Sequence, residues 1–308
     1  MKNIWRINMK TDGANKENGG QEGLLKFCQK ENIVGIGWSQ MYPQFIEGYN
    51  GDKNNTENIK NYIWNKIKKD SGKTRGFSTA SNIIVDRMNI GDYIWTREGG
   101  NYWIAKVISE SKYMFNNQDY KNYDIGFYRN VEYSRRSFTV SEVPGKVIAC
   151  FSARNSTQCI SDDQKLLFEY TDSLFNNKIN SKINVDNWSN FFSANDIEEI
   201  IGLYLQKIKN LYVYTSTNKK STSQIEFELV DDKGNKYGVQ VKSGNVCING
   251  KDYKEISKNM KIYLFASNNE VKNVEDNQNL IHIKVDEITT FIKENINILP
   301  DRIKNWIK

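Results

Sequence analysis

The chain contains a single histidine, and this scarcity narrows the chemistry that it can perform. His282 is the only imidazole among 308 residues, and it lies in the alternating segment 280–285. A lone histidine excludes a two-histidine metal motif, and no local signal supports a Ser-His-Asp triad. We interpret His282 as a residue on one face of a strand. Any catalysis must therefore depend on carboxylate and lysine side chains.

Cysteines are few and long apolar runs are missing. The four cysteines are widely spaced and form no C-x-x-C pair, which argues against a zinc site or a disulfide framework. No apolar run is long enough to span a membrane, and the N-terminus lacks the apolar core of a signal peptide. We expect a soluble, cytoplasmic protein. Its formal net charge of +6 permits a polyanionic partner without requiring one.

The length of 308 residues suits two domains, and the patterns change along the chain. Residues 1–155 show many short strands with a few helices, which predicts a small β-barrel with flanking helices. Residues 156–187 are polar around one helical run and are interpreted as a linker with a helix. Residues 188–308 predict an α/β module, so the expected fold class is a two-domain α+β or α/β protein. Strands are predicted over 4–9, 33–38, 92–96, 102–108, 125–133, 146–151, 224–230, 239–244, 261–267 and 279–285, and helices over 57–68, 78–88, 163–175, 193–208, 287–295 and after Pro300.

Two alternating segments of the second half predict a hairpin that carries polar groups on one face. Segments 224–230 and 239–244 alternate apolar and polar residues, and the charged, Gly-containing segment 231–236 joins them. A carboxylate, an amide oxygen and a lysine on one face of paired strands can hold a divalent cation over a phosphate. The apolar face is predicted to hold Ile225, Phe227, Leu229, Val239 and Val241, and the polar face Glu226, Glu228, Gln240 and Lys242.

The helix that precedes this hairpin brings an early glutamate. Asn195 and Glu198 are spaced as a capping box, and an apolar stripe continues to Ile208. The order of elements is a helix with an acid near its start, a strand with a carboxylate, and a strand that ends in Gln-x-Lys. Over about residues 190–270, this order resembles the PD-(D/E)xK nuclease superfamily and in particular its Mrr-like branch. The resemblance implies a restriction-endonuclease-like fold and Mg²⁺- or Mn²⁺-dependent hydrolysis of phosphodiesters. It implies catalytic roles for Glu198, Glu226, Gln240 and Lys242, with Glu199 and Glu228 as rivals for the two glutamates.

The chemistry of these residue types is compatible with that implication. Glu226, the side-chain oxygen of Gln240 and the carbonyl of Val241 are oxygen ligands of the kind that Mg²⁺ prefers. Lys242 would orient the attacking water or stabilise the charged transition state. This sequence departs from the usual pattern in having Glu for Asp and Gln for the second acid. The alternative is an ordinary cross-strand ion pair between Glu226 and Lys242.

Four short motifs in the first half resemble the PUA-like superfamily, in which EVE and YTH domains look nearest. The motifs are Trp-Arg-Ile-Asn at 5–8, the Gly-rich segment 33–39, Gly-Asp-Tyr-Ile-Trp-Thr at 91–96 and Tyr-Trp-Ile-Ala-Lys-Val at 102–107. The resemblance implies a domain that reads a modified base in an aromatic pocket. Its candidate base-binding residues are Trp38, Ser39, Tyr93, Trp95 and Asp124, and its candidate phosphate contacts are Arg6, Arg97, Arg129, Arg135 and Arg136.

Together these patterns predict a metal-dependent DNA endonuclease, directed by the first domain and serving modification-dependent restriction in antiphage defence. Three alternatives stay open. The enzyme could cut at an unmodified site, the nuclease fold could be a degenerate scaffold for DNA or RNA binding, or the substrate could be RNA. Because a double-strand cut needs two active sites, we expect a homodimer at least on substrate.

Overall fold

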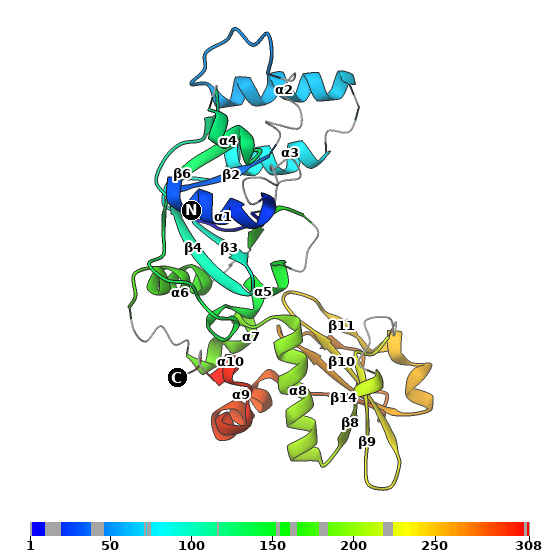
Figure 1. Ribbon diagram of the computed structural model, residues 1–308. Coiled ribbons are helices and arrows are strands. Elements are labelled where there is room, and N and C mark those ends of the chain that lie inside the picture. Colours follow the sequence, from blue (N-terminus) through cyan, green and yellow to red (C-terminus); the bar gives the residue numbers. More distant parts are fainter. Residues whose placement is uncertain are drawn as a thin grey trace. The chain divides into compact units, whose positions relative to one another are not determined.

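The computed structural model describes residues 2–9, 20–37, 46–70, 72, 75–115, 117–151, 155–160, 165–178, 184–217, 224–304 and 307. It shows a mixed α+β protein, as the sequence predicts (Figure 1). The chain divides into two compact units, of which unit 1 comprises residues 1–143 and 147–181. Unit 2 comprises residues 182–308 and the short segment 144–146. Within the described ranges, no helix is both long and apolar enough to cross a membrane.

Unit 1 is built on a seven-stranded sheet that curls into a half-barrel. The strand order is β2-β6-β4-β3-β1-β7, and β5 pairs with β6. The first strand is an interior strand, since β1 pairs with β3 in parallel and with the edge strand β7 antiparallel. Its strands are β1 (Ile4–Ile7), β2 (Ile33–Ile36), β3 (Tyr93–Glu98), β4 (Asn101–Val107), β5 (Lys112–Tyr113), β6 (Phe127–Tyr133) and β7 (Thr157–Ile160). Its helices are α1 (Gly20–Glu31), α2 (Thr56–Asp70), α3 (Arg75–Ser81), the π-helix Asn82–Arg87, α4 (Gln118–Asn122) and α6 (Leu166–Phe175).

A buried carboxylate fixes the start of unit 1 to its third strand. Asp92 is fully buried and accepts hydrogen bonds from the backbone N–H groups of Asn3 and Asn89. It also accepts one from the indole Nε1 of Trp5, at 2.7 Å. Three donors offset the cost of burying this charge. The Gly-Asp motif at 91–92 therefore holds β1 against β3.

Two predictions for unit 1 are wrong. Residues 146–151, expected as a strand, belong to helix α5 (Gly145–Phe151), in which Val147 and Phe151 are buried at helical spacing. Residues 156–187, expected as a linker with a helix, instead contribute β7 and α6 to unit 1, and the main part of unit 2 begins only at residue 182. A short apolar run fits either a strand or a buried helix, which explains the first error.

Unit 2 has a five-stranded sheet in the order β14-β12-β10-β9-β8. β10 forms the predicted hairpin with β9 and pairs with β12 in parallel, and β12 pairs with β14 in parallel. The carboxyl ends of β10, β12 and β14 therefore meet at one edge of the sheet. The elements are α7 (Trp188–Phe191), α8 (Ala194–Lys209), β8 (Tyr212–Tyr214), β9 (Phe227–Val230), β10 (Lys236–Lys242), β11 (Ile248–Asn249), β12 (Lys261–Ala266), β13 (Val271–Lys272), β14 (Leu280–His282), α9 (Val285–Glu294) and α10 (Asp301–Lys304).

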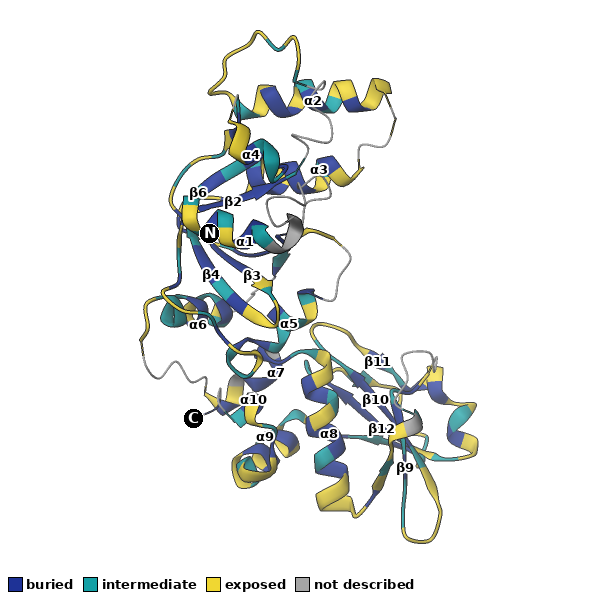
Figure 2. Ribbon diagram, in the orientation of Figure 1, coloured by how far each residue is buried: buried dark blue, intermediate teal, exposed yellow. Residues whose placement is uncertain are grey.

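The two faces of this sheet are covered by different segments of unit 2. Helix α8 covers the face of Phe227 and Val239, since a Cβ at Gly202 would lie 3.7 Å from the Phe227 ring. Figure 2 shows α8 buried along one side and exposed along the other. On the other face, Ile262, Leu264 and Ala266 pack with residues that follow β10.

Ile225 lies on a different face from the predicted one. It packs in the cluster of Ile262 and Leu264, and a Cβ at Gly238 would lie 3.2 Å from its side chain. The reason is that β9 begins only at Phe227, so the alternation does not extend back to Ile225. The other four members of the predicted apolar face, Phe227, Leu229, Val239 and Val241, are buried.

Candidate functional site

The predicted polar residues meet where β10 ends. Phe227, the first residue of β9, pairs with Val239, and Gln240 is the next residue of β10. The Glu226 N–H donates to the carbonyl of Val239 at 2.7 Å, which keeps Glu226 beside β10 although β9 has not yet begun. Gln240 and Lys242 project from one face of β10, away from α8. This hydrogen bond and the alternation of β10 therefore bring Glu226, Gln240 and Lys242 together.

One oxygen of Glu226 is the centre of this cluster. Gln240 Nε2 donates to Glu226 Oε1 at 2.8 Å and to the Val241 carbonyl oxygen at 3.3 Å. Lys242 Nζ lies 3.5 Å from the same Glu226 oxygen. Gln240 is buried at 3 % exposure, whereas the side chains of Glu226 and Lys242 are 32 % and 40 % exposed. The cluster thus joins a buried amide to an accessible carboxylate and ammonium.

Register also separates Glu226 from its rival Glu228. Glu228 lies opposite Gly238, on the far side of the Phe227–Val239 pair from the carboxyl end of β10. Its N–H donates to Thr217 Oγ1 at 3.0 Å, and its side chain is half-buried. The contacts to Gln240 and Lys242 are made by Glu226 instead.

The helix glutamates lie on α8. β8 and β10 both run antiparallel to β9, and α8 leads directly into β8. The N-terminus of α8 therefore lies toward the carboxyl end of β10, as Figure 1 shows. Glu198 is half-buried one turn before Gly202, and Glu199 is exposed. The predicted cap is wrong, because Ser193 and Asp196 form the capping box.

Two residues near the cluster were not among the predicted site residues. Burial, together with Asp252 and Glu226, raises the pKa of the Tyr253 hydroxyl, so this buried tyrosine keeps its proton at neutral pH. His282 pairs with Leu264, which pairs with Gln240, so the three residues form one row across the sheet. Burial lowers the pKa of His282, and its Nε2 has no hydrogen-bond partner among the described residues. Neither position follows from the motif, because each depends on strand register or on a later loop.

The oxygen atoms around Glu226 suit a hard cation that keeps most of its water ligands. Among the described residues no group of three or more His, Cys, Asp or Glu side chains could hold a metal ion. Glu226 Oε1 and the Val241 carbonyl oxygen both face the Gln240 amide nitrogen. A half-turn of that carboxamide would present its oxygen instead, which gives three oxygen ligands. Mg²⁺ commonly keeps several waters and binds through one or two carboxylates, so these residues fit it.

In unit 1, Tyr93 and Trp95 belong to the core, which corrects their assignment as walls of an open pocket. Trp95 is fully buried, donates from Nε1 to Thr171 Oγ1 at 3.2 Å and packs against Phe138. Tyr93 is buried and donates to Asp172 Oδ1 at 2.6 Å. Both partners lie on α6, which covers β3. Asp124 is also buried, near Gly37, and Trp38 and Ser39 lie outside the described residues.

Two of the candidate phosphate contacts are structural residues. Arg6 is buried and donates to the Asn155 carbonyl and to Gln158 Oε1. Arg129 is 1 % exposed and donates to the carbonyls of residues 84, 85 and 109 at 2.6, 3.1 and 3.0 Å. Burial lowers the pKa of both guanidinium groups. The exposed candidates are Arg97, Arg135 and Arg136, of which Arg97 lies over Phe151 and Arg136 pairs with Glu142.

Arg129→Ala is expected to lower the free energy of unfolding of unit 1 by about 2–4 kcal/mol, because the substitution leaves three carbonyl acceptors without their charged donor. Urea denaturation would measure this loss. The salt dependence of DNA binding should stay unchanged, because this buried guanidinium does not reach the phosphates of bound DNA. A stable variant that binds DNA less tightly would instead show that Arg129 contacts phosphate.

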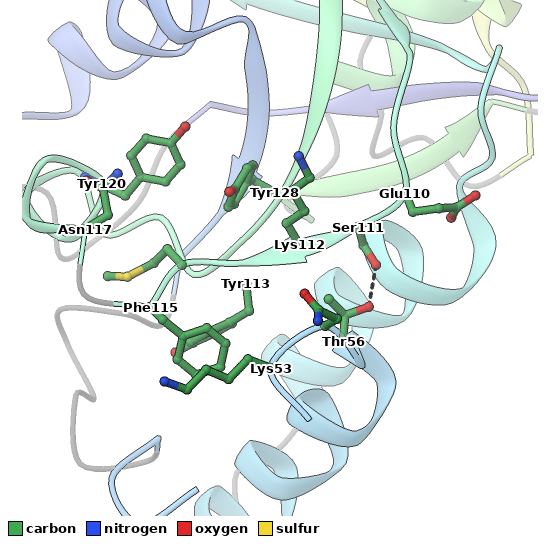
Figure 3. Close-up of a pocket in the computed structure, with 12 residues that line it drawn as sticks. Lys53, Thr56, Glu110, Ser111, Lys112, Tyr113, Phe115, Asn117, Tyr120 and Tyr128 are labelled. Carbon is green, nitrogen blue, oxygen red and sulfur yellow. Dashed lines mark hydrogen bonds between the residues drawn. The ribbon is translucent and has the colours of Figure 1, made fainter. Parts of the chain in front are cut away.

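An open cavity does exist in unit 1, but other residues line it. It has a volume of about 490 Å³ and lies between the start of α2, strand β5, helix α4 and β6 (Figure 3). Four aromatic rings line it, and the hydroxyls of Thr56 and Ser111 share a 2.7 Å hydrogen bond at its edge. The rings are those of Tyr113, Phe115, Tyr120 and Tyr128. We call this the aromatic cavity.

No family model matches the chain, and neither the comparison with curated proteins nor that with solved structures finds a significant match. The resemblances to the PD-(D/E)xK and PUA-like superfamilies therefore stay predictions from the motifs.

Proposed function

We propose that the protein is a metal-dependent DNA endonuclease, with unit 2 as the cutting unit and unit 1 as a base reader. The observation that carries the proposal is the shared oxygen of Glu226, which lies 2.8 Å from the Gln240 amide and 3.5 Å from Lys242 Nζ. These groups lie at the carboxyl edge of three parallel strands, where α/β proteins commonly bind ligands. Phosphodiester hydrolysis needs this combination of oxygen ligands and a positive charge.

Each residue has a role that follows from its position. Glu226, Val241 and Gln240 would hold Mg²⁺, which stabilises charge on the phosphate and lowers the pKa of a bound water. Lys242 is accessible and would place its ammonium on a phosphate oxygen, where negative charge grows in the transition state.

A second candidate function is binding without cleavage, on a degenerate nuclease fold. One observation favours it: the Gln240 amide presents its nitrogen to Glu226 Oε1 and to the Val241 carbonyl, so it acts there as a donor and not as an oxygen ligand. An amide also holds a cation more weakly than a second carboxylate would. In this reading, Glu226 and Lys242 form an ordinary ion pair.

The two functions are separated by cleavage profiling. Pools of DNA that differ only in base modification are incubated with the intact protein, with Mg²⁺ or with EDTA. The endonuclease proposal expects Mg²⁺-dependent cuts concentrated at modified bases. Cuts in every pool would indicate an unmodified site instead. Binding without cuts, in DNA and RNA alike, would reject the endonuclease in favour of the scaffold. Cleavage of both strands by a dimer is the expected form of the activity.

Gln240→Glu is expected to strengthen Mn²⁺ binding by at least about tenfold, because a second carboxylate replaces the amide that now contacts Glu226. Isothermal titration calorimetry with Mn²⁺ alone measures this change. Gln206→Glu is the matched control, since it adds the same charge on the exposed part of α8. Equal effects of the two substitutions would mean that the cation responds only to net charge.

A further inference from the structure

The aromatic cavity has the walls that a planar ring requires. Tyr113 and Phe115 pack edge to face with centroids 5.1 Å apart, and Tyr120 and Tyr128 do so at 5.0 Å. Phe115 and Tyr128 are half-buried, so part of each ring remains available to a ligand. Lys53 Nζ lies 5.4 Å from the Phe115 centroid, and Figure 3 shows the two side chains together. Partly exposed rings beside a lysine are typical of surfaces on which nucleobases stack.

The cavity is larger than a methylated base needs. A volume of about 490 Å³ lies within the range of pockets that hold drug-sized ligands. A base with only a methyl group would leave much of this space to water. The cavity therefore suits a base that carries a larger substituent.

A polar hollow of about 600 Å³ adjoins the cavity and indicates what that substituent is. The two share Asn54, Thr56, Glu110 and Ser111. The polar hollow adds carboxylates and amides that can accept or donate hydrogen bonds. Its further lining residues are Asp52, Asn55, Glu57, Val85 and Asp86.

The charge of the polar hollow is partly neutralised. Asp86 pairs with Lys60, and Glu110 lies 3.4 Å from Arg129. The remaining acids, Asp52 and Glu57, disfavour an anionic substituent. A methyl group cannot form hydrogen bonds with their carboxylates. Hydroxyl groups would find acceptors in the carboxylates and both donors and acceptors in the amides.

We propose that the aromatic cavity and the polar hollow together bind a nucleobase that carries a hydroxyl-rich, sugar-like substituent, with the ring stacked on Phe115 and the substituent beyond Thr56. This inference rests on the proposed role of unit 1 as a base reader. It gives that role a different set of residues from the motif-based one. It also defines the chemical class of the modification.

The test measures binding of the intact protein to short DNA duplexes in EDTA, by fluorescence anisotropy. The duplexes differ only in one cytosine, which is unmodified, 5-methylated, 5-hydroxymethylated or glucosylated on the hydroxymethyl group. The glucosylated duplex is expected to bind at least about tenfold more tightly than the methylated one, as a few good hydrogen bonds would allow. Equal affinity for all four duplexes would overturn the inference.

Substitutions in the aromatic cavity test whether it is the site of this binding preference. Phe115→Ala is expected to weaken binding of the glucosylated duplex by about 5- to 100-fold through lost stacking, and Phe115→Leu serves as a second variant that better keeps the apolar volume. Thr56→Val should reduce only the preference for the glucosylated base. Val140→Ala, which shortens an exposed side chain of unit 1, is the control. Wild-type binding by both Phe115 variants, with unchanged thermal unfolding, would contradict the inference.

The outcome is separable from that of the endonuclease proposal. Binding in EDTA requires no cleavage, and Glu226→Ala should keep the preference among the four duplexes. A protein that shows the preference and never cuts DNA would overturn the endonuclease alone. A protein that cuts DNA and shows no preference would overturn the reading cavity alone.

Discussion

Lys242→Ala is expected to lower the rate of Mg²⁺-dependent DNA cleavage by about 100- to 1,000-fold, the usual effect of removing one group that stabilises transition-state charge. The substitution removes the ammonium 3.5 Å from Glu226 Oε1 and leaves the strand pairing of β10 intact. Single-turnover cleavage of a labelled duplex measures the effect. Because the side chain is 40 % exposed and its ion pair is worth at most about 1 kcal/mol, stability should change little.

A matched control lies at the other end of the same strand. Lys236→Ala removes an exposed lysine from the start of β10, far from Glu226 along the strand. It should cut DNA at the wild-type rate. If Lys242→Ala also cuts at that rate, the ammonium has no catalytic role, and the pair with Glu226 is an ordinary surface contact.

Trp95→Ala is expected to destabilise unit 1 by about 3–5 kcal/mol, the range for truncating a large aromatic side chain in a core. The indole is fully buried, and its loss leaves a cavity against Phe138 and an unpaired hydroxyl at Thr171. For a unit of this size, the melting temperature should fall by about 2–4 °C for each kcal/mol. Differential scanning calorimetry measures the shift of the unit 1 transition.

The comparison variant for Trp95 is two residues away. Arg97→Ala removes an exposed side chain from the same strand and should shift the transition by less than about 0.5 kcal/mol in equivalent free energy. If Trp95→Ala folds as stably as the wild type and loses base binding instead, the indole belongs to a pocket, as its motif first indicated.

Features that depend on local sequence were predictable. The alternation in 224–230 and 239–244 predicts the hairpin, and the Gly-containing turn between these segments limits the register. Glu226 comes directly before the paired part of β9, and its backbone hydrogen bond to Val239 keeps it beside Gln240. The apolar stripe of 193–208 likewise predicts α8, whose inner side is buried. For such segments, the pattern and the tertiary structure agree.

Features that depend on a distant segment were not predictable. Tyr93 and Trp95 are core residues because α6, some 75 residues later in the chain, covers them. Arg129 can be buried because backbone carbonyls near residues 84 and 109 accept hydrogen bonds from its guanidinium. No sequence pattern shows which backbone carbonyls an arginine will contact. The aromatic cavity likewise combines rings from β5, the segment after β5, α4 and β6 with hydroxyls from α2 and the β4–β5 connection. A motif identifies residue types, whereas packing decides which of them face a ligand.

The segment 144–146 affects how this protein can be divided. It belongs to unit 2, while the residues on both sides of it belong to unit 1. Gly145 lies so close to Asp196 that a Cβ there would overlap the carboxylate. A truncated protein beginning at residue 182 would lack this segment and expose the side chain that it covers. Because the chain passes between the units more than once, expression of either half alone should use a circularly permuted or co-expressed design rather than a single cut.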